Sequence, residues 1–471
     1  MKTVFATIIF LLVVIFANAQ HTLTLKQAIE TGIANNLDVN QSDLLMQKAD
    51  IALKQSKLNM LPNLNASANH GTNQGRSIDP FSNAFINQNV DYASYSASSN
   101  ILLFNGSSLT NRIRGNRLGY EASQMELQQA KDNLTINIIL AYLGILSAED
   151  ILETSRNLSM VTEKQVERLG ILNQSGAISP SQYFDLKGQL ANDQIAIVDN
   201  QAALDNAKLT LSQLLNIPYD KNMDVERLPE SSFDIEYEAA PDKIYQTALQ
   251  QFAQVKAVHL RTESAKKIIR SVQGELYPTL SLNGNINTNY SSAATQSLLV
   301  NSVDIPSTDY VVINGSQIPV ITKQSNFDTK KITYGSQIKN NKFTTVNLGL
   351  SIPLFNAGIV KSRIKLAKID LKNDELIEQN TKTQLQQSIE RAYVNFTSTS
   401  EKYKILLDQV KSFQESFRAA EILFNSGATT SVDYLIAKNN LDRTNTNLII
   451  SKYDFMLRSK VLDYYEGKAL W

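Results

Sequence analysis

The chain has 471 residues, balances 45 Lys and Arg residues against 45 Asp and Glu residues, and contains no cysteine. The lack of cysteine excludes a disulfide-linked mini-scaffold, a zinc-thiolate domain and a catalytic thiol, and the zero net charge gives no sign of a nucleic-acid partner. Charged residues make up 19% of the chain, against about 25% in typical soluble proteins. This composition, rich in Ser, Asn, Gln and Thr, indicates an envelope protein with polar surfaces that face water.

Residues 1–19 have the pattern of a secretory signal peptide. Lys2 supplies the basic start, an apolar stretch ends at Phe16, and the small-residue sequence Ala17-Asn18-Ala19 follows. The apolar stretch is shorter than the roughly 20 residues that a membrane-spanning helix needs. No cysteine follows it, so no lipoprotein anchor is expected. Further along, no apolar run reaches the length of a helical span, whereas an outer-membrane β-barrel is allowed because its strands alternate in polarity.

The mature chain opens with a helical pattern from about Leu25 to Leu61, and a second one runs from about Pro241 to Tyr277. Apolar residues recur at helical spacing in the first segment. A proline closes each pattern, since proline removes a hydrogen-bond donor and clashes with the preceding turn. We therefore predict two long helices, one in each half of the chain.

Strand patterns follow each helix. Apolar residues alternate with Asn and Ser from Leu280 to Tyr290, and again from Val346 to Ile352, with weaker equivalents at residues 64–68 and 93–101. The apolar face of such strands packs on a second sheet in a soluble sandwich, or faces lipid in an outer-membrane barrel. Four strands are too few to close a barrel around water, so a barrel requires several chains.

A long helical hairpin comes next. The segment from Ser108 to about Leu172 contains no proline and would be about 100 Å long as a helix. Residues 175–180 break it, with Ser179 as the expected N-cap and Pro180 at the first helical position. The returning helix carries a coiled-coil seam. We interpret its two polar positions, Asp193 and Asn200, as residues that set the register.

The two halves of the chain repeat one another. Pro62 matches Pro278 at an offset of 216 residues, and Leu103-Phe104-Asn105 matches Leu354-Phe355-Asn356 at an offset of 251. The difference between the offsets indicates an insertion in the second copy, at about 291–341, which reads as a long polar loop. The predicted organisation is therefore a signal peptide, residues 1–19; a first structural repeat, 20–216; a linker, 217–240; and a second repeat, 241–471, with the extended loop.

Motifs in both halves resemble the TolC family of outer-membrane efflux and secretion channels. The opening Leu23-Thr24-Leu25-Lys26-Gln27-Ala28-Ile29 is similar to the first helix of that family, and Pro353-Leu354-Phe355-Asn356-Ala357-Gly358 to its strand-to-helix turn. The segment from Ser426 to Leu435 is similar to its hairpin end. Each motif is weak alone, but their order, the duplication and the signal peptide together are fairly specific.

The resemblance implies a mixed α and β fold with a duplicated helix-strand-strand-helix-helix unit. In that family a homotrimer gives four strands per chain to a 12-stranded β-barrel in the outer-membrane lipid, and long helices to a periplasmic α-helical barrel. It implies docking on a periplasmic adaptor (membrane fusion) protein bound to an inner-membrane pump. The expected function is a passive exit duct for small molecules or proteins, in multidrug efflux, metal efflux or type I secretion. No cofactor and no catalysis are implied.

The resemblance also places functional residues at the hairpin ends. Asp433 matches an acidic position that rings the periplasmic entrance in the family. The second acidic position of the family, three residues later, is Ile436 here, and Asp185 occupies the corresponding place in the first copy and could substitute for it. A ring of carboxylates at a constriction attracts cations, although a first-turn acid of a helix is an equally good interpretation of Asp433. Phe424 and Thr429 match gate positions, but neither keeps the residue type of the family. The ends expected to dock on the adaptor are Ser175, Gly176, Ala177, Ser426, Gly427 and Ala428.

Two other function classes compete with a channel. An enzyme is disfavoured, because the three histidines, His21, His70 and His259, lie far apart in sequence and no nucleophile motif, phosphate loop or metal-ligand spacing occurs. The second is a periplasmic coiled-coil adaptor or structural envelope protein without a pore. The alternating strands in both halves speak against it.

Overall fold

The computed structural model describes residues 22–79, 83–229 and 240–468. The predicted signal peptide and residues 230–239 of the predicted linker lie outside these residues. The chain divides into two compact units. A helical unit comprises the described parts of Met1–Ala52, Asn116–Lys266 and Ile369–Trp471, and a strand unit comprises Leu53–Gly115 and Lys267–Lys368.

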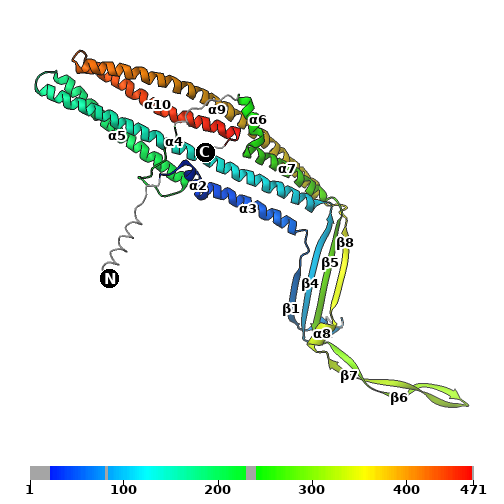
Figure 1. Cartoon of the computed structure of the whole chain (residues 1–471). Coiled ribbons are helices and arrows are strands. Elements are labelled where there is room, and N and C mark those ends of the chain that lie inside the picture. Colours follow the sequence, from blue (N-terminus) through cyan, green and yellow to red (C-terminus); the bar gives the residue numbers. More distant parts are fainter. Residues whose placement is uncertain (1–21, 80–82, 230–239, 469–471) are drawn as a thin grey trace, which may run out of the picture. The chain divides into compact units, whose positions relative to one another are not determined.

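Apart from a short helix in the insertion, the helices of the described residues occur in four pairs of equal length, which confirms the duplicated unit. Each helix of the second half has the bounds of a first-half helix moved by 216 residues, for the two short pairs, or by 251 residues, for the two long pairs. Figure 1 shows both sets. The pairs are α2 (Leu25–Asn35) with α6 (Pro241–Gln251), α3 (Leu37–Leu58) with α7 (Ala253–Gly274), α4 (Ser108–Gln174) with α9 (Ile359–Asn425), and α5 (Pro180–Leu215) with α10 (Ser431–Glu466).

The prediction of one continuous helix at the start of each half is wrong, because each segment is interrupted once. Asn36 adopts an extended conformation with ψ of 130°, and Phe252 does so with ψ of 122°. The Asn36 side chain accepts hydrogen bonds from the backbone N–H groups of Asp38 and Val39, at 2.9 and 3.2 Å, and so begins the next helix. Phe252 packs its ring on Tyr464 in an edge-to-face contact. Side-chain contacts thus override the helical periodicity at these two points.

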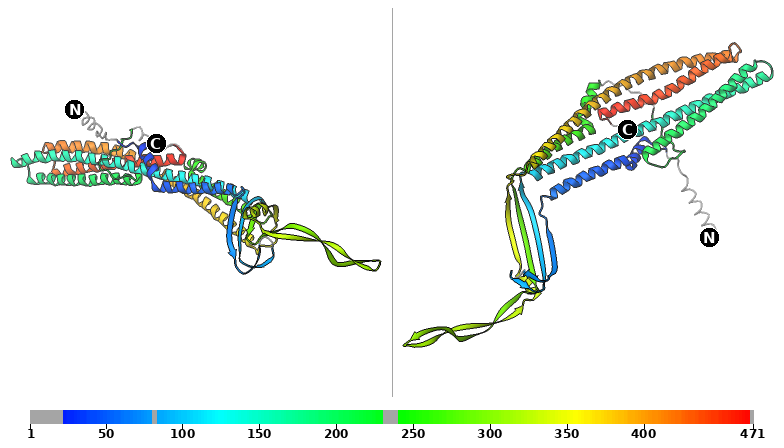
Figure 2. Two further views of the ribbon diagram at one scale, coloured as in Figure 1. Left: turned by 90° about the horizontal axis from the view of Figure 1, so that it is seen from below. Right: turned by 180° about the vertical axis from the view of Figure 1, so that it is seen from behind.

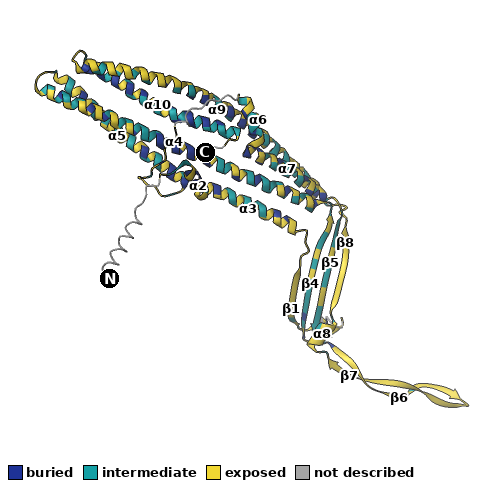
Figure 3. Cartoon of the chain, viewed as in Figure 1, coloured by how far each residue is buried: buried dark blue, intermediate teal, exposed yellow. Residues whose placement is uncertain are grey.

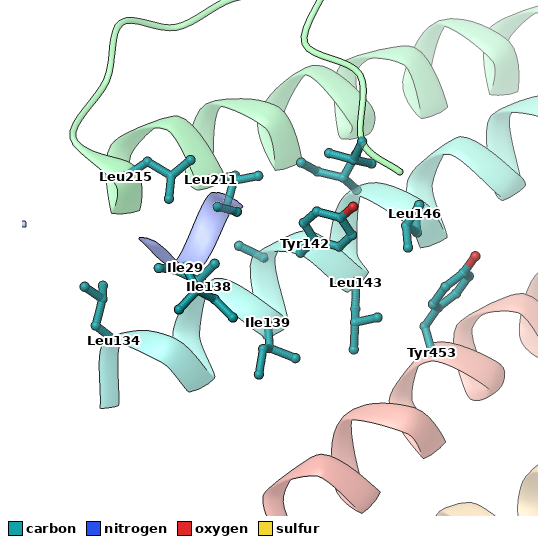
Figure 4. Close-up of a cluster of buried hydrophobic side chains, with 14 of the residues drawn as sticks. Ile29, Leu134, Ile138, Ile139, Tyr142, Leu143, Leu146, Leu211, Leu215 and Tyr453 are labelled. Atoms are coloured by element: carbon teal, nitrogen blue, oxygen red, sulfur yellow. The ribbon is translucent and has the colours of Figure 1, made fainter. Parts of the chain in front are cut away.

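The helical unit has its largest core where α2 crosses α4 and α5 (Figure 4). The apolar face of α4 is fully buried there, with Ile138, Tyr142 and Leu146 at its centre. A second core joins α6 and α9 to α10 around Ile389 and Phe455. Figure 2 shows the two long hairpins, α4 with α5 and α9 with α10, running side by side within this unit.

Among the described residues, α4 is the helix that is long and apolar enough to cross a membrane by length and composition alone. Half of its apolar window is buried inside the protein. The sequence had not predicted such a segment, because Asn137 interrupts the apolar run. Its burial among α2, α5 and α10 identifies this part of α4 as a core segment.

The strand unit contains a four-stranded antiparallel sheet in the order β1-β4-β5-β8, as the alternating patterns predict. Opposite residues include Ala66 with Ala97, Ala97 with Ile286, and Leu282 with Leu348. Within the described chain, β1 and β8 each pair on one side only. The bounds are β1 (Asn65–Asn73), β4 (Val90–Asn105), β5 (Thr279–Ser291) and β8 (Phe343–Ser351).

The insertion in the second half is structured, so its interpretation as a polar loop is wrong. It forms a two-stranded hairpin, β6 (Thr295–Ile313) with β7 (Ser316–Lys331), followed by the short helix α8 (Tyr334–Asn340). Asn314 and Gly315 connect the strands, and both have positive φ, 49° and 83°, which matches the twist of a tight hairpin. The first half has only a small hairpin at this place, β2 (Arg76–Ile78) with β3 (Phe85–Asn87).

Candidate functional site

The two long hairpins end in matching turns, which are the predicted docking positions. Gly176 and Gly427 have φ of 70° and 74°, the left-handed conformation that closes a helix. The residue after each glycine donates its backbone N–H to a carbonyl of the last helical turn, Ala177 to Leu172 at 2.9 Å and Ala428 to Leu423 at 2.8 Å. All six predicted docking residues are exposed. Both turns therefore present backbone and small side chains to the surroundings.

The helices that leave these turns begin differently. Ser179 is the N-cap of α5 as predicted, but its side chain makes no capping hydrogen bond. Thr430 caps α10 in a reciprocal box with Asp433, whose N–H donates to the Thr430 hydroxyl at 3.2 Å. The N-terminus of α10 is therefore held by side chains, and that of α5 by Pro180 and the backbone alone.

Asp433 lies in this first turn, exposed to solvent. Its carboxylate accepts hydrogen bonds from the hydroxyls of Thr430 and Thr429, each at 2.8 Å. These bonds hold the pKa of Asp433 below its ordinary value. The carboxylate is consequently ionised at neutral pH, and it stabilises the start of α10 through the helix dipole.

Asp185 connects the two hairpins. Its carboxylate accepts a hydrogen bond from the Ser431 hydroxyl at 2.9 Å, and from Ser181 of its own helix at 3.4 Å. Ser431 is buried and lies two residues before Asp433. Both predicted acidic residues therefore lie near the first turn of α10. Asp433 is part of that turn, and Asp185 reaches it from α5 of the other hairpin.

Phe424 is buried between the hairpins. Its ring stacks on Tyr434 with 4.8 Å between centroids, in a small core with Leu169 and Leu186. Thr429 donates to Asp433 as described above. Both residues thus stabilise the end of the second hairpin within a single chain.

Two cations near the hairpin ends were not predicted. The Arg168 guanidinium, on α4, donates to the carbonyl oxygen of Asn425 at 2.7 Å and to its side chain, where it meets the negative end of α9. Lys438, on α10, is 1% exposed and forms ion pairs with Asp193 at 3.1 Å and with Asp442 at 2.6 Å. Thr162 of α4 also donates to Asp193, at 2.5 Å.

This buried cluster replaces our interpretation of Asp193 as an ordinary register position in the seam. It joins α4, α5 and α10, so its charges connect the two hairpins. Burial raises the pKa of Asp442, and the neighbouring Lys438 opposes that shift. A polar cavity of about 290 Å³ lies beside the cluster. No group of three or more potential metal ligands occurs among the described residues.

The sheet has one polar and one apolar face. A row of asparagines, Asn100, Asn283 and Asn347, crosses β4, β5 and β8, and Asn100 donates its side-chain amide to Asn283. The opposite face carries an apolar row that includes Leu282 and Leu348. The Leu348 side chain is 63% exposed. Within one chain, this apolar surface of the strand unit is uncovered.

The two described histidines belong to different units of the chain. His70 is in β1, and His259 is in α7, where its ring contacts Glu378 at 3.2 Å. His21 lies outside the described residues.

Long paired helices, together with a sheet that is polar on one face and apolar on the other, make up the fold of outer-membrane channel proteins. Its likeness to solved structures is extensive, although sequence identity is low. The chain matches CusC at 16% identity and a TM-score of 0.76, covering 95% of this chain and 93% of that one. It matches VceC of Vibrio cholerae at 15% and 0.74, covering 95% and 97%, and CmeC of Campylobacter jejuni at 15% and 0.74, covering 94% and 85%.

The chain belongs to the outer membrane efflux protein family, whose sequence profile matches residues 28–216 and 244–460. It is 22% identical over 344 residues to the outer membrane protein TolC of Salmonella enteritidis, covering 72% of this chain and 62% of that protein. The Escherichia coli K12 TolC is 20% identical over 333 residues, covering 70% and 60%. The chain thus spans less than two thirds of the length of these curated relatives.

Family membership confirms three predictions made from the sequence. The resemblance to the TolC family is correct, the protein belongs to the bacterial outer membrane, and its family is one of non-enzymatic efflux proteins.

Proposed function

We propose that three copies of this chain form an outer-membrane channel, the passive exit duct of a tripartite efflux or type I secretion system. The observation that carries this proposal is the sheet, with its apolar row exposed and its edge strands β1 and β8 each paired on one side. In a three-chain barrel the edges pair, the apolar face meets lipid and the asparagine face lines a water-filled lumen. Four strands from each chain make a barrel wide enough for water.

The duplication predicts a register between neighbouring chains. Moving the β1–β4 pairing by the two offsets of the duplication, 216 and 251, converts the pair Ala66 with Ala97 into Leu282 with Leu348, which is the register observed between β5 and β8. For the β4–β5 pair Ala97 with Ile286, adding 251 to the first number and subtracting 216 from the second gives Leu348 opposite His70. We assign this pair to β8 of one chain and β1 of the next. Both offsets therefore support β8 of one chain pairing with β1 of its neighbour.

In this proposal the helical unit forms the periplasmic part of the duct. The turns around Gly176 and Gly427 face away from the membrane and dock on a periplasmic adaptor protein, which is bound to an inner-membrane pump. Their exposure and small side chains suit close packing against another helical end. We also propose that the two structural repeats, 20–216 and 241–471, are the units from which both barrels are built.

The entrance is proposed to carry the acidic residues. Asp433 is exposed and ionised, and three copies around one axis would favour cations and repel one another. Asp185 adds a second charge from the neighbouring hairpin. Phe424 and Thr429 act as gate residues indirectly, because they hold the hairpin end that presents Asp433.

Single-channel conductance in a planar lipid bilayer tests this function. We expect discrete openings with a cation preference, blocked by trivalent cations added on the periplasmic side. Asp433→Ala should weaken the preference and the block, whereas Asp408→Ala, which removes an exposed acid within α9, should change neither. Insertion without any conductance in both the parent and Asp433→Ala would refute the channel. A protein that stays soluble and never inserts would favour the coiled-coil adaptor.

A further inference from the structure

The hairpin β6–β7 is anchored firmly at its base. Ser291, Gln337 and Asp79 are buried there, and the Gln337 side chain bonds the backbone of Ser291 in both directions, at 2.9 and 3.0 Å. Ser291 also donates its hydroxyl to Asp79. A satisfied buried polar cluster fixes its members in one geometry. The hairpin is therefore attached to the sheet by a defined joint.

Beyond this base the hairpin has two chemically different halves. The half next to the sheet, which we name the stalk, comprises residues 295–304 and 322–331 and carries both charge signs. The outer half, which we name the tip, comprises residues 305–321, and its one charged residue is Asp309. Figure 3 shows both strands exposed along their length. The tip thus presents mainly apolar side chains to water. The stalk also exposes apolar side chains, among them Leu299, Val300 and Phe327, but it mixes them with charged residues of both signs.

The apolar side chains of the tip lie on both faces of the ribbon. Opposite residues share a face and successive residues alternate, so Tyr310 and Val312 lie on one face, and Val311 and Ile318 on the other. Each of these four side chains is about half exposed. A two-stranded hairpin is marginal in water, and apolar surface of this kind marks an interaction site.

We infer that the tips of three chains pack together on the three-fold axis and form an apolar cap outside the outward end of the channel. This inference rests on the proposed trimer. A closed ring of three requires two different surfaces on each subunit, one for each neighbour, and the tip offers two. A membrane surface or one flat partner would cover a single face and leave the other in water.

The anchored base of each hairpin also favours the tips of the other two chains as its partners. Chain connectivity places the hairpin between β5 and β8, at the end of the sheet opposite the strand-to-helix turns. Closing the barrel therefore brings three hairpins to one rim and raises their effective concentration. The stalks carry charges of both signs, so they stay hydrated and leave lateral openings between them, through which cargo leaves.

Cysteine cross-linking tests the cap, because the natural chain has no cysteine that would interfere. Val312→Cys with Ile318→Cys places one thiol on each face of the tip, and thiols that point apart within one ribbon cannot join. We expect oxidation of the purified detergent-solubilised protein to give covalent trimers. The matched stalk pair, Ser302→Cys with Gln324→Cys, also has one thiol on each face, and we expect it to stay unlinked.

The pair His70→Cys with Leu348→Cys reports on the strand edges independently. Edge linkage without tip linkage would refute the cap and keep the proposed channel. Absence of both linkages, together with a monomeric mass in light scattering, would refute the proposed trimer itself. Tip linkage equal to stalk linkage would also refute the cap, since it would reflect random collisions. Removal of residues 296–330 should leave the trimer intact, because the sheet edges hold it.

Discussion

Replacement of Lys438 by methionine tests whether the buried charge cluster holds the hairpins together. Methionine is only one atom shorter than lysine and carries no charge, so in this variant Asp193 and Asp442 face each other without the Lys438 cation. Their side chains are 10% and 19% exposed, and the lysine itself 1%. Breaking a buried pair in this way costs about 3–5 kcal/mol, because it leaves an uncompensated buried charge. The cost should appear as easier local opening of α5 and α10.

Hydrogen–deuterium exchange of the detergent-solubilised protein measures that opening. Since about 1.4 kcal/mol corresponds to a factor of ten, amide protection in the outer parts of α5 and α10 should fall by about two to four powers of ten. Lys411→Met is the matched control, because Lys411 and Asp408 are 77% and 84% exposed. An exposed pair contributes about 0–1 kcal/mol, so protection there should change by less than tenfold.

A compensated variant separates charge from packing. Adding Asp193→Asn and Asp442→Asn to Lys438→Met removes all three charges, and we expect most of the protection to return, since neutral replacement of a whole buried cluster is often tolerated. A loss below tenfold in Lys438→Met would show that the cluster does not hold the hairpins. Failure of the compensated variant to recover would show that the lysine acts through its packing.

Three further outcomes are expected. Hydrogen bonding lowers the pKa of Asp433 in the folded protein, so the capping by its carboxylate is fully present above the ordinary carboxyl pKa of 3.8 and is lost as the pH falls through the lower pKa of the folded state. Amide protection at the start of α10 should therefore persist down to about pH 4 and decrease at pH values below 3.8. In Asp433→Ala this decrease should vanish. Gly106→Ala should prevent assembly, measured as the yield of trimer, because Gly106 has φ of 62° and an added Cβ would lie 2.3 Å from the backbone carbonyl oxygen of Gly274. Gly176 has φ of 70° but open space around it, so Gly176→Ala should lower the free energy of unfolding by about 1–2 kcal/mol and still assemble. Leu348→Lys should destabilise the inserted protein by about 2–4 kcal/mol near the membrane midplane, measured by urea unfolding from vesicles, whereas Asn347→Lys on the polar face should have little effect.

Periodicity and duplication predicted most of the fold. The long helices, the four sheet strands and both hairpin turns lie where the patterns placed them, because one amphipathic face and one turn motif determine each of them. Asn36 and Phe252 break the predicted helices for local reasons, a side-chain cap and a buried ring. The Asn-Gly pair at Asn314 and Gly315, between two apolar runs, was the available signal for the missed hairpin. The many polar and charged residues of the insertion, mixed with its apolar ones, obscured it.

The burial of Lys438 and its acidic partners could not be predicted from the sequence. Lys187 occupies the position of Lys438 in the first repeat and is exposed, so the same residue type has opposite surroundings in the two copies. Lys438 is followed four residues later by Asp442, where Lys187 is followed by Ala191, but only the packing of one hairpin on the other brings Asp193 to Lys438. Asp433 and Asp185, by contrast, were found because both lie at fixed positions after a recognisable turn.

Pairing between β8 of one chain and β1 of the next is the feature on which the channel depends. Oxidation of the His70→Cys and Leu348→Cys double variant in the assembled protein measures it directly, with Thr72→Cys in place of His70→Cys as the control two residues out of register. We predict covalent trimers for the first pair and little linkage for the second. A chain that remains monomeric under denaturing conditions with both pairs would contradict the three-chain barrel.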